Sequence, residues 1–169
     1  MQPQLVFFVS IVFGLLAWGI VAARYIWPKL RDKQRAEALR PLLFLHSFRY
    51  LGLATLVPGV VSPDLPASFA QPEAYGDFIA ATLALLTLLL LPRKAGLGVA
   101  WIFNIWGSAD ILNAFYHGNA AGLLAGQLGA TYFIVTLFVP LLLITHALAF
   151  RILLQPQSES VMRESLQPA

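Results

Sequence analysis

The segment that decides the fold is WIFNIWGSADILNAFYHG, residues 101–118. It is apolar enough for a membrane-spanning helix, yet polar side chains occur on two of its faces. Asn104 and Ser108 fall on one face of such a helix, and the second polar face lies nearly opposite. The other face spans an arc of about 60° and consists of Trp106, Asp110, Asn113 and His117. A helix that is polar on two sides avoids lipid, so we expect it at the centre of a bundle.

Composition extends this expectation to the whole chain. The 169 residues are 59% hydrophobic and 11% charged, whereas soluble domains carry about 25% charged residues. A transmembrane helix needs about 20 mostly apolar residues. The stretches that meet or approach this length are residues 5–27, 41–61, 76–91, 97–117 and 128–150. We therefore predict an all-α polytopic membrane bundle of five transmembrane helices, which forms a single domain over residues 1–154. A disordered cytoplasmic tail is expected at 155–169.

Lysine and arginine predict the orientation, because they gather in cytoplasmic loops. Arg49 lies inside a predicted span, and the other ten fall on one side of the membrane: Arg24, Lys29, Arg31, Lys33, Arg35, Arg40, Arg93, Lys94, Arg151 and Arg163. The predicted loops of the opposite side carry Asp64 and Glu73 instead. We expect the N-terminus outside and the C-terminus inside, in a multi-pass protein of a bacterial inner membrane. The cations form no patch interleaved with aromatic residues, so nucleic acid is not an expected partner.

Ionisable side chains inside a bilayer are costly and therefore mark candidate sites. In the second predicted span, His46, Arg49 and Tyr50 share one face at α-helical spacing. Asp77, at the start of the third span, is expected near the polar face of residues 101–118. We predict an outward-facing polar pocket for an ion, a proton or the polar head of a ligand, lined by Arg49, Asp77, Trp106, Asp110, Asn113 and His117. Alternatively, these groups only hydrogen-bond the helices to one another.

The partner of Arg49 is open at this point. Asp110 is the obvious counter-ion, but the two residues differ in predicted depth by several ångströms, at about 1.5 Å per residue. A bond through Asn104 or through water fits the sequence as well as a direct ion pair does.

His46 and His146 suggest a different function. Each lies roughly one helical turn from the inner end of its predicted span, at about 3.6 residues per turn. Two imidazoles at equal depth are the axial ligands that a b-type haem requires. A bis-histidine haem electron-transfer protein is therefore an alternative hypothesis. No other cofactor is predicted, and the sequence leaves any metal site undetermined.

Signatures of common enzymes do not occur in the sequence. It has no cysteine, no HExxH and no GxSxG. We therefore favour a non-enzymatic protein of the lipid bilayer that binds or transports a ligand or ion. It would act as a homo-oligomer or as an accessory subunit of a larger membrane complex. A purely structural or interaction subunit is the third hypothesis.

Overall fold

The computed structural model describes residues 2–156, and this part of the chain is all-helical, as predicted. Its elements in chain order are α1 (Pro3–Val21), η1 (Ala22–Ile26), α2 (Trp27–Leu30), α3 (Arg35–His46), η2 (Ser47–Leu56), α4 (Ala67–Leu90), α5 (Gly96–Ala120), η3 (Ala125–Thr131), η4 (Ile134–Phe138) and α6 (Val139–Leu154). Most of the predicted tail, from residue 157 onward, lies outside the described residues.

Three helices are long and apolar enough to cross a membrane: Pro3–Leu30, Ala67–Leu90 and Ile134–Leu154. The predicted spans at 41–61 and 97–117 are largely helical, as α3–η2 and α5, but do not reach the same combination of length and apolarity. Their polar residues lower the apolarity of both segments.

Several span boundaries differ from the prediction, and two of them bear on the site. The third span was expected from residue 76, but α4 begins at Ala67. Proline usually interrupts a helix, but Pro66 only precedes α4 and Pro72 is accommodated inside it. The second span was expected to reach residue 61, but η2 ends at Leu56 and a turn follows.

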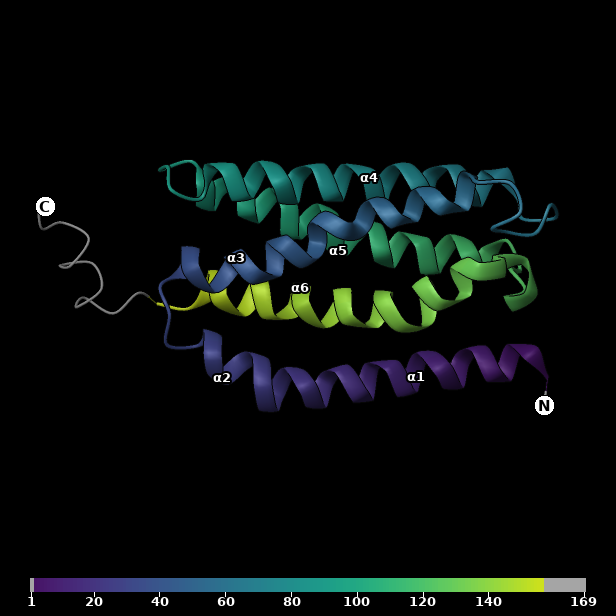
Figure 1. Ribbon diagram of the computed structural model, residues 1–169, viewed down its shortest axis with the longest axis horizontal. Coiled ribbons are helices and arrows are strands. Elements are labelled where there is room, and N and C mark those ends of the chain that lie inside the picture. Colours follow the sequence, from purple (N-terminus) through teal and green to yellow (C-terminus); the bar gives the residue numbers. More distant parts are fainter. Residues whose placement is uncertain (1, 157–169) are drawn as a thin grey trace, which may run out of the picture.

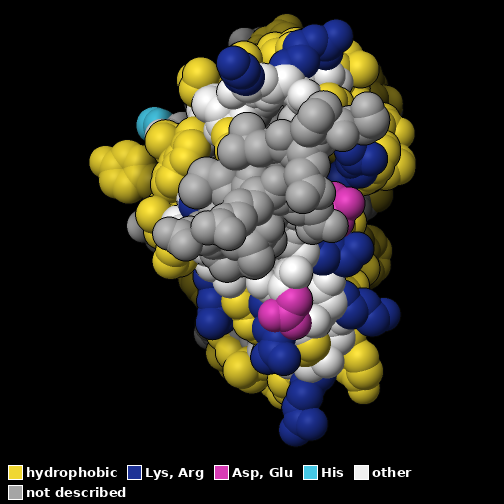
Figure 2. All heavy atoms as spheres, turned by 90° about the vertical axis from the view of Figure 1, so that its left-hand side faces the viewer, with side chains coloured by type: hydrophobic (Ala, Val, Ile, Leu, Met, Phe, Trp, Pro, Cys, Tyr) yellow, Lys and Arg dark blue, Asp and Glu magenta, His cyan; other side chains and the backbone are white. Residues whose placement is uncertain are grey.

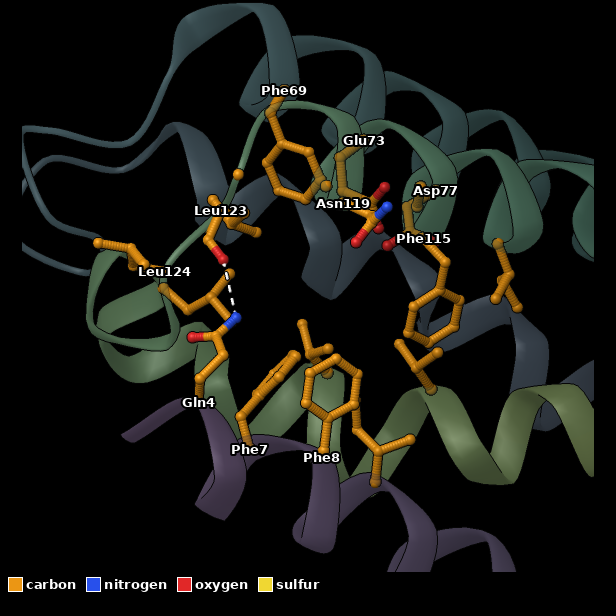
Figure 3. Close-up of a pocket in the computed structure, with 18 residues that line it drawn as sticks. Gln4, Phe7, Phe8, Phe69, Glu73, Asp77, Phe115, Asn119, Leu123 and Leu124 are labelled. Carbon is orange, nitrogen blue, oxygen red and sulfur yellow. Dashed lines mark hydrogen bonds between the residues drawn. The ribbon is translucent and has the colours of Figure 1, made fainter. Parts of the chain in front are cut away.

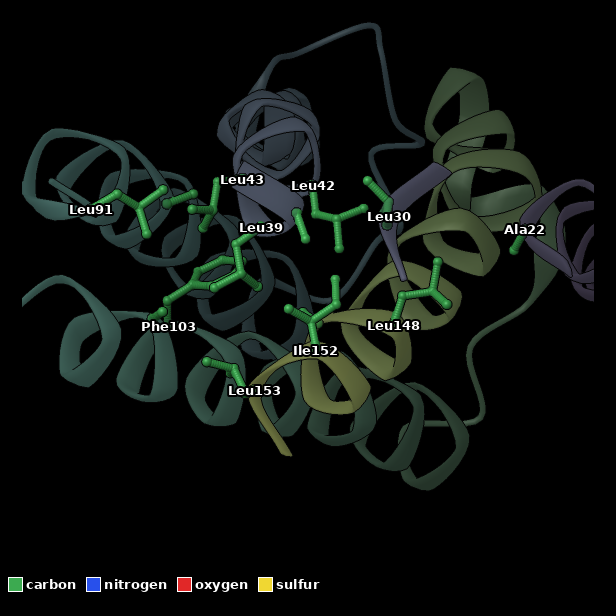
Figure 4. Close-up of a cluster of buried hydrophobic side chains, with 14 residues drawn as sticks. Ala22, Leu30, Leu39, Leu42, Leu43, Leu91, Phe103, Leu148, Ile152 and Leu153 are labelled. Carbon is green, nitrogen blue, oxygen red and sulfur yellow. The ribbon is translucent and has the colours of Figure 1, made fainter. Parts of the chain in front are cut away.

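The helices form one bundle with α1 at its edge (Figure 1). The segment α3–η2 packs against α4, which also packs along α5, and α6 contacts α3 and α5. α1 contacts α6, η3 and η4 and has no fully buried residue. At one end of the bundle, buried side chains of α3, α5 and α6 such as Leu39, Phe103 and Ile152 form the largest apolar core (Figure 4). This core fixes the helix ends beneath the polar residues described below.

Pro28 and Pro140 each follow a π-helical turn, one in the helix that begins with α1 and one in the helix that ends with α6. η1 precedes Pro28, and η4 precedes Pro140. A proline cannot donate its backbone hydrogen bond and its ring crowds the preceding turn, so the helix widens there. Trp18 of α1 donates its indole N–H to the carbonyl oxygen of Leu137 in η4, over 3.0 Å. The carbonyl oxygen of Leu137, in the π-helical turn η4, thus accepts a hydrogen bond that links α1 to this turn.

The two ends of the bundle differ in charge. Figure 2 shows Lys and Arg side chains gathered at the end where α2 and the C-terminus of α6 lie. Here Arg151 stacks on Trp27, with its guanidinium carbon 3.9 Å from the ring centroid. The segments at the opposite end, 57–66 and 121–133, contain no lysine or arginine and carry Asp64.

Candidate functional site

The site begins with the unusual geometry of η2. It is a 3-10 helix of 10 residues, whereas such helices seldom exceed about 4 residues. With about three residues per turn, side chains three apart lie in one row. The row that is buried continues from α3 into η2 and consists of His46, Arg49, Gly52 and Thr55. Tyr50, expected on the same face, is instead 47% exposed. In 3-10 geometry it lies about 120° around the axis from His46, whereas an α-helix would place it only about 40° away.

Arg49 is the centre of the site and is only 1% exposed. Its Nε donates to Oδ1 of Asp77, and its Nη2 donates to Oδ2 of Asp110, each over 2.7 Å. Nη2 also lies 2.7 Å from Oδ1 of Asp77. Nη1 donates to the carbonyl oxygen of Gly107 over 2.9 Å and lies 3.3 Å from Nε2 of His146. Every nitrogen of the guanidinium therefore has an acceptor, which a buried cation requires.

The ion pairs join three helical segments. Arg49 belongs to η2, Asp77 to α4 and Asp110 to α5. The two carboxylate side chains are 9% and 11% exposed. The question left open by the sequence is thus answered by direct contact between Arg49 and Asp110. With both carboxyl groups ionised, one guanidinium pairs with two carboxylates and one negative charge remains in excess. We call these three residues the charge cluster.

Glycines make the space for this cluster. A Cβ on Gly52 would lie 2.1 Å from Oδ2 of Asp77, and one on Gly76 would lie 1.8 Å from Oδ1 of Asp110. A Cβ on Gly107 would lie 2.8 Å from Nη1 of Arg49. Each distance is far below van der Waals contact, so any side chain at these positions would displace the ion pairs.

Hydrogen bonds assign the protons of His146. A guanidinium group can only donate hydrogen bonds, so Nε2 of His146 accepts from Arg49. The imidazole proton is then on Nδ1. Nδ1 donates to Oδ1 of Asn104 over 2.7 Å, and Nδ2 of Asn104 donates back to the carbonyl oxygen of His146 over 3.3 Å. The chain of bonds is consistent with a neutral imidazole that extends the charge cluster into α6.

The geometry of the two histidines does not fit a shared haem. Their ring centroids are 4.1 Å apart, whereas two metal–nitrogen bonds of about 2 Å each would separate the centroids by roughly 6 Å. His46 also bonds through Nε2 to Oγ1 of Thr145 over 3.0 Å. Both rings are therefore in contact with each other and engaged with neighbouring side chains. Among residues 2–156, no group of three or more His, Cys, Asp or Glu side chains is placed to hold a metal ion.

A cavity of about 600 Å³ lies beside the charge cluster, between α1, α4 and α5. Figure 3 shows Phe7 and Phe8 of α1 on one wall and Phe69 of α4 on the opposite wall. Glu73 and Asp77 of α4 also line it. Asp77 thus belongs both to the charge cluster and to the cavity wall.

Gln4 closes one side of the cavity and ties α1 to the rest of the bundle. Its Nε2 donates to the carbonyl oxygen of Leu123 over 3.1 Å, and its Oε1 accepts from the backbone N–H of Ala125 over 3.3 Å. Both ends of its amide are therefore bonded to the backbone. The charged residues that line the cavity are Glu73 and Asp77 of α4.

The structure brings together three of the six predicted pocket residues: Arg49, Asp77 and Asp110. Trp106 is 43% exposed, and Asn113 and His117 are also on the outer surface of α5. The buried face of α5 is defined instead by Asn104 and Gly107, with Asp110 at its edge. The expected stripe of four polar side chains therefore does not line one pocket.

Sequence reasoning missed Glu73, because it fell in a presumed loop, and the three glycines, because they carry no chemistry of their own. One signal was available for the glycines. Gly52 and Gly107 each lie three residues from an ionisable residue of the cluster, and Gly76 immediately precedes one.

Comparison with known proteins gives a family assignment and no precedent for the activity. Residues 6–154 match the family described as "Domain of unknown function (DUF8737)". No curated protein and no solved structure matches the chain. The matched range contains the whole charge cluster and both acidic residues of the cavity.

Proposed function

Since the chain belongs to the DUF8737 family, a domain of unknown function, we propose a function from its own site. It is a non-enzymatic integral membrane protein that binds a small amphipathic ligand in the cavity between α1, α4 and α5. The observation that carries this proposal is a cavity of about 600 Å³ in which phenyl walls adjoin carboxylates. Cavities that hold drug-sized ligands span about 300–1,000 Å³ and combine apolar walls with a few polar groups.

The proposed membrane topology has five crossings, with α3–η2 and α5 as the two polar ones. Both lie within the bundle beside helices that are long and apolar enough to span. Their buried charges are paired inside the bundle, as intramembrane charges must be. The basic end is proposed to face the cytoplasm, and the cavity then lies in the outer half of a bacterial inner membrane.

The absence of cysteine from the sequence makes this topology easy to test. Asp64→Cys and Asp32→Cys each place a single thiol on an exposed residue, at opposite ends of the bundle. In intact cells, a membrane-impermeant maleimide is expected to label the variant at position 64 and to label that at position 32 only after lysis. Labelling in the reverse order, or of both from outside, would disprove the proposed orientation.

Ligand binding is tested with three probes that share a naphthyl body and differ in the head: naphthylethylamine, naphthylethanol and naphthylacetate. Ala114→Phe fills the cavity from α5, and Ala109→Phe makes the same change on the exposed side of that helix. With the protein in nanodiscs, titration calorimetry should detect at least one probe bound to wild type and to Ala109→Phe. Ala114→Phe should not bind it. If no probe binds, or if Ala114→Phe binds as wild type does, the proposal fails.

The same site is compatible with two contexts in the cell. α1 exposes apolar side chains along its length, such as Phe8, Phe13 and Ile20, and these suit acyl chains or a neighbouring subunit. We propose that the protein works in the bilayer as a ligand-binding or transport component, alone, as a homo-oligomer or in a larger complex. If ligand binding fails, the charge cluster retains the structural role of joining helices.

A further inference from the structure

We infer, on the premise that the proposed binding function holds, that the ligand is an organic cation. It is an amphiphile with a protonated amine that pairs with Glu73 and Asp77 while its apolar body lies against the phenylalanines of α1, α4 and α5. The inference concerns the charge of the head group, which the shape of the cavity alone does not determine.

The charges around the cavity are unbalanced. The residues that line it include Glu73 and Asp77 but no lysine, arginine or histidine. Asp77 shares the single guanidinium of Arg49 with Asp110. Within residues 2–156, no side chain forms a hydrogen bond or an ion pair with Glu73. Three carboxyl groups therefore face one cation, and the carboxyl group without a partner is the one beside the empty space.

Neighbouring groups make this wall suitable for a hydrogen-bond donor. Figure 3 shows Glu73, Asn119 and Asp77 together on one side of the cavity, with Phe115 beside them. Carboxylate oxygens only accept hydrogen bonds, and an amide oxygen accepts as well. An ammonium head supplies up to three N–H donors, and its bonds to carboxylates are charge-assisted and short.

The aromatic walls favour an organic cation over a metal ion. Phe7, Phe8, Phe69 and Phe115 offer ring faces and edges, but phenyl groups are not ligands for hard cations. An ammonium group gains from aromatic faces through cation–π attraction. An alkyl or aryl body also removes water from the same walls, which a hydrated metal ion does not do.

Anionic ligands are disfavoured by the distribution of lysine and arginine. The guanidinium nitrogens of Arg49 all have acceptors. Figure 2 shows Lys and Arg side chains gathered at the opposite end of the bundle, and segments 57–66 and 121–133 at the cavity's end contain none. A carboxylate or phosphate in the cavity would lie beside Glu73 with no free cation, and like charges at short distance repel. The polarity of the cavity thus selects against acidic lipids.

The test uses the naphthyl probes with two isosteric variants of wild type. Glu73→Gln removes one charge inside the cavity, and Asp64→Asn removes one at the same end of the bundle but outside it. Naphthylethylamine is expected to bind wild type about tenfold more tightly than naphthylethanol does, the size of one charge-assisted hydrogen bond, and naphthylacetate more weakly than either. Glu73→Gln should reduce amine affinity about tenfold and leave naphthylethanol unchanged, and Asp64→Asn should alter neither.

The outcomes separate the two proposals. If all three probes bind wild type equally and Ala114→Phe blocks them, the cavity binds amphiphiles but does not select cations, and this inference is wrong. Equal losses in Glu73→Gln and Asp64→Asn would mean that surface charge attracts the amine, which also overturns it. If no probe binds at all, the proposed function itself fails. Retained naphthylethanol binding by Glu73→Gln demonstrates that this variant is folded.

Discussion

Arg49→Met is expected to lower the free energy of unfolding by about 3–5 kcal/mol, the usual result of removing one partner from a buried ion pair. Methionine replaces the aliphatic part of the side chain but leaves Asp77 and Asp110 without a counter-ion, at positions that are largely shielded from solvent. Their carboxyl groups then either remain charged without a counter-ion or become protonated, and both outcomes destabilise the fold. The loss is measured by thermal and denaturant unfolding in detergent, with tryptophan fluorescence as the signal.

A neutral triple variant distinguishes charge from packing in this experiment. In Arg49→Met combined with Asp77→Asn and Asp110→Asn, no buried charge of the cluster is left unpaired, so we expect most of the lost stability to return. Double-mutant comparison of this kind isolates the coupling between neighbouring groups. If the triple variant is no more stable than Arg49→Met, the arginine acts through its volume, and the electrostatic account of the cluster is wrong.

The parts of the site that could be predicted follow from a single physical rule. Charged groups within apolar segments are costly unless they are paired, so Arg49, Asp77 and Asp110 stand out in the sequence. The structure brings these three together. The rule does not depend on knowing helix geometry, which explains why it succeeds where arguments about helix faces do not.

Arguments about faces failed at two places for different reasons. Tyr50 was assigned to the face of Arg49 on α-helical spacing, but η2 has 3-10 geometry and aligns residues three apart. On α5, the polar stripe from Trp106 to His117 was expected to face inward. The face that packs against the neighbouring helices instead contains Asn104 and Gly107, because a small residue allows close approach. Gly107 admits Arg49 and His146, while Asn113 and His117 are left on the surface.

Helix rise and side-chain length explain why depth counted along the sequence left the partner of Arg49 open. Depth counted along the sequence assumes that each helix rises about 1.5 Å per residue, whereas a 3-10 helix rises about 2.0 Å. Arg49 is the third residue of η2, so the larger rise carries it only about 1–2 Å deeper. The long arginine side chain spans the rest of the difference. Contact between Arg49 and Asp110 then needs no intermediate water.

Gly52→Ala is expected to destabilise the protein about as much as the loss of Arg49 does. The new Cβ would lie 2.6 Å from Cβ of Asp77, an atom that no rotation of the side chain can move away. The backbones of η2 and α4 must therefore separate, which breaks the bonds between Arg49 and Asp77. Overpacking costs about 1–3 kcal/mol and a lost charge-assisted bond about 1.5–3 kcal/mol, so we expect a total of about 2.5–6 kcal/mol.

Gly98→Ala is the matched control, because a Cβ at this position of α5 meets nothing within 4 Å. It should leave stability unchanged or raise it by about 0.5–1 kcal/mol, since alanine favours helix over glycine. A second measurement ties the effect to the cluster: Asp77→Asn should cost clearly less in the Gly52→Ala background than in wild type, because the ion pair is already broken there. If the two glycine variants unfold alike, or if the cost of Asp77→Asn is the same in both backgrounds, the fold does not depend on the close contact between η2 and α4. The buried position of Arg49 in η2 would then need an explanation other than this close contact.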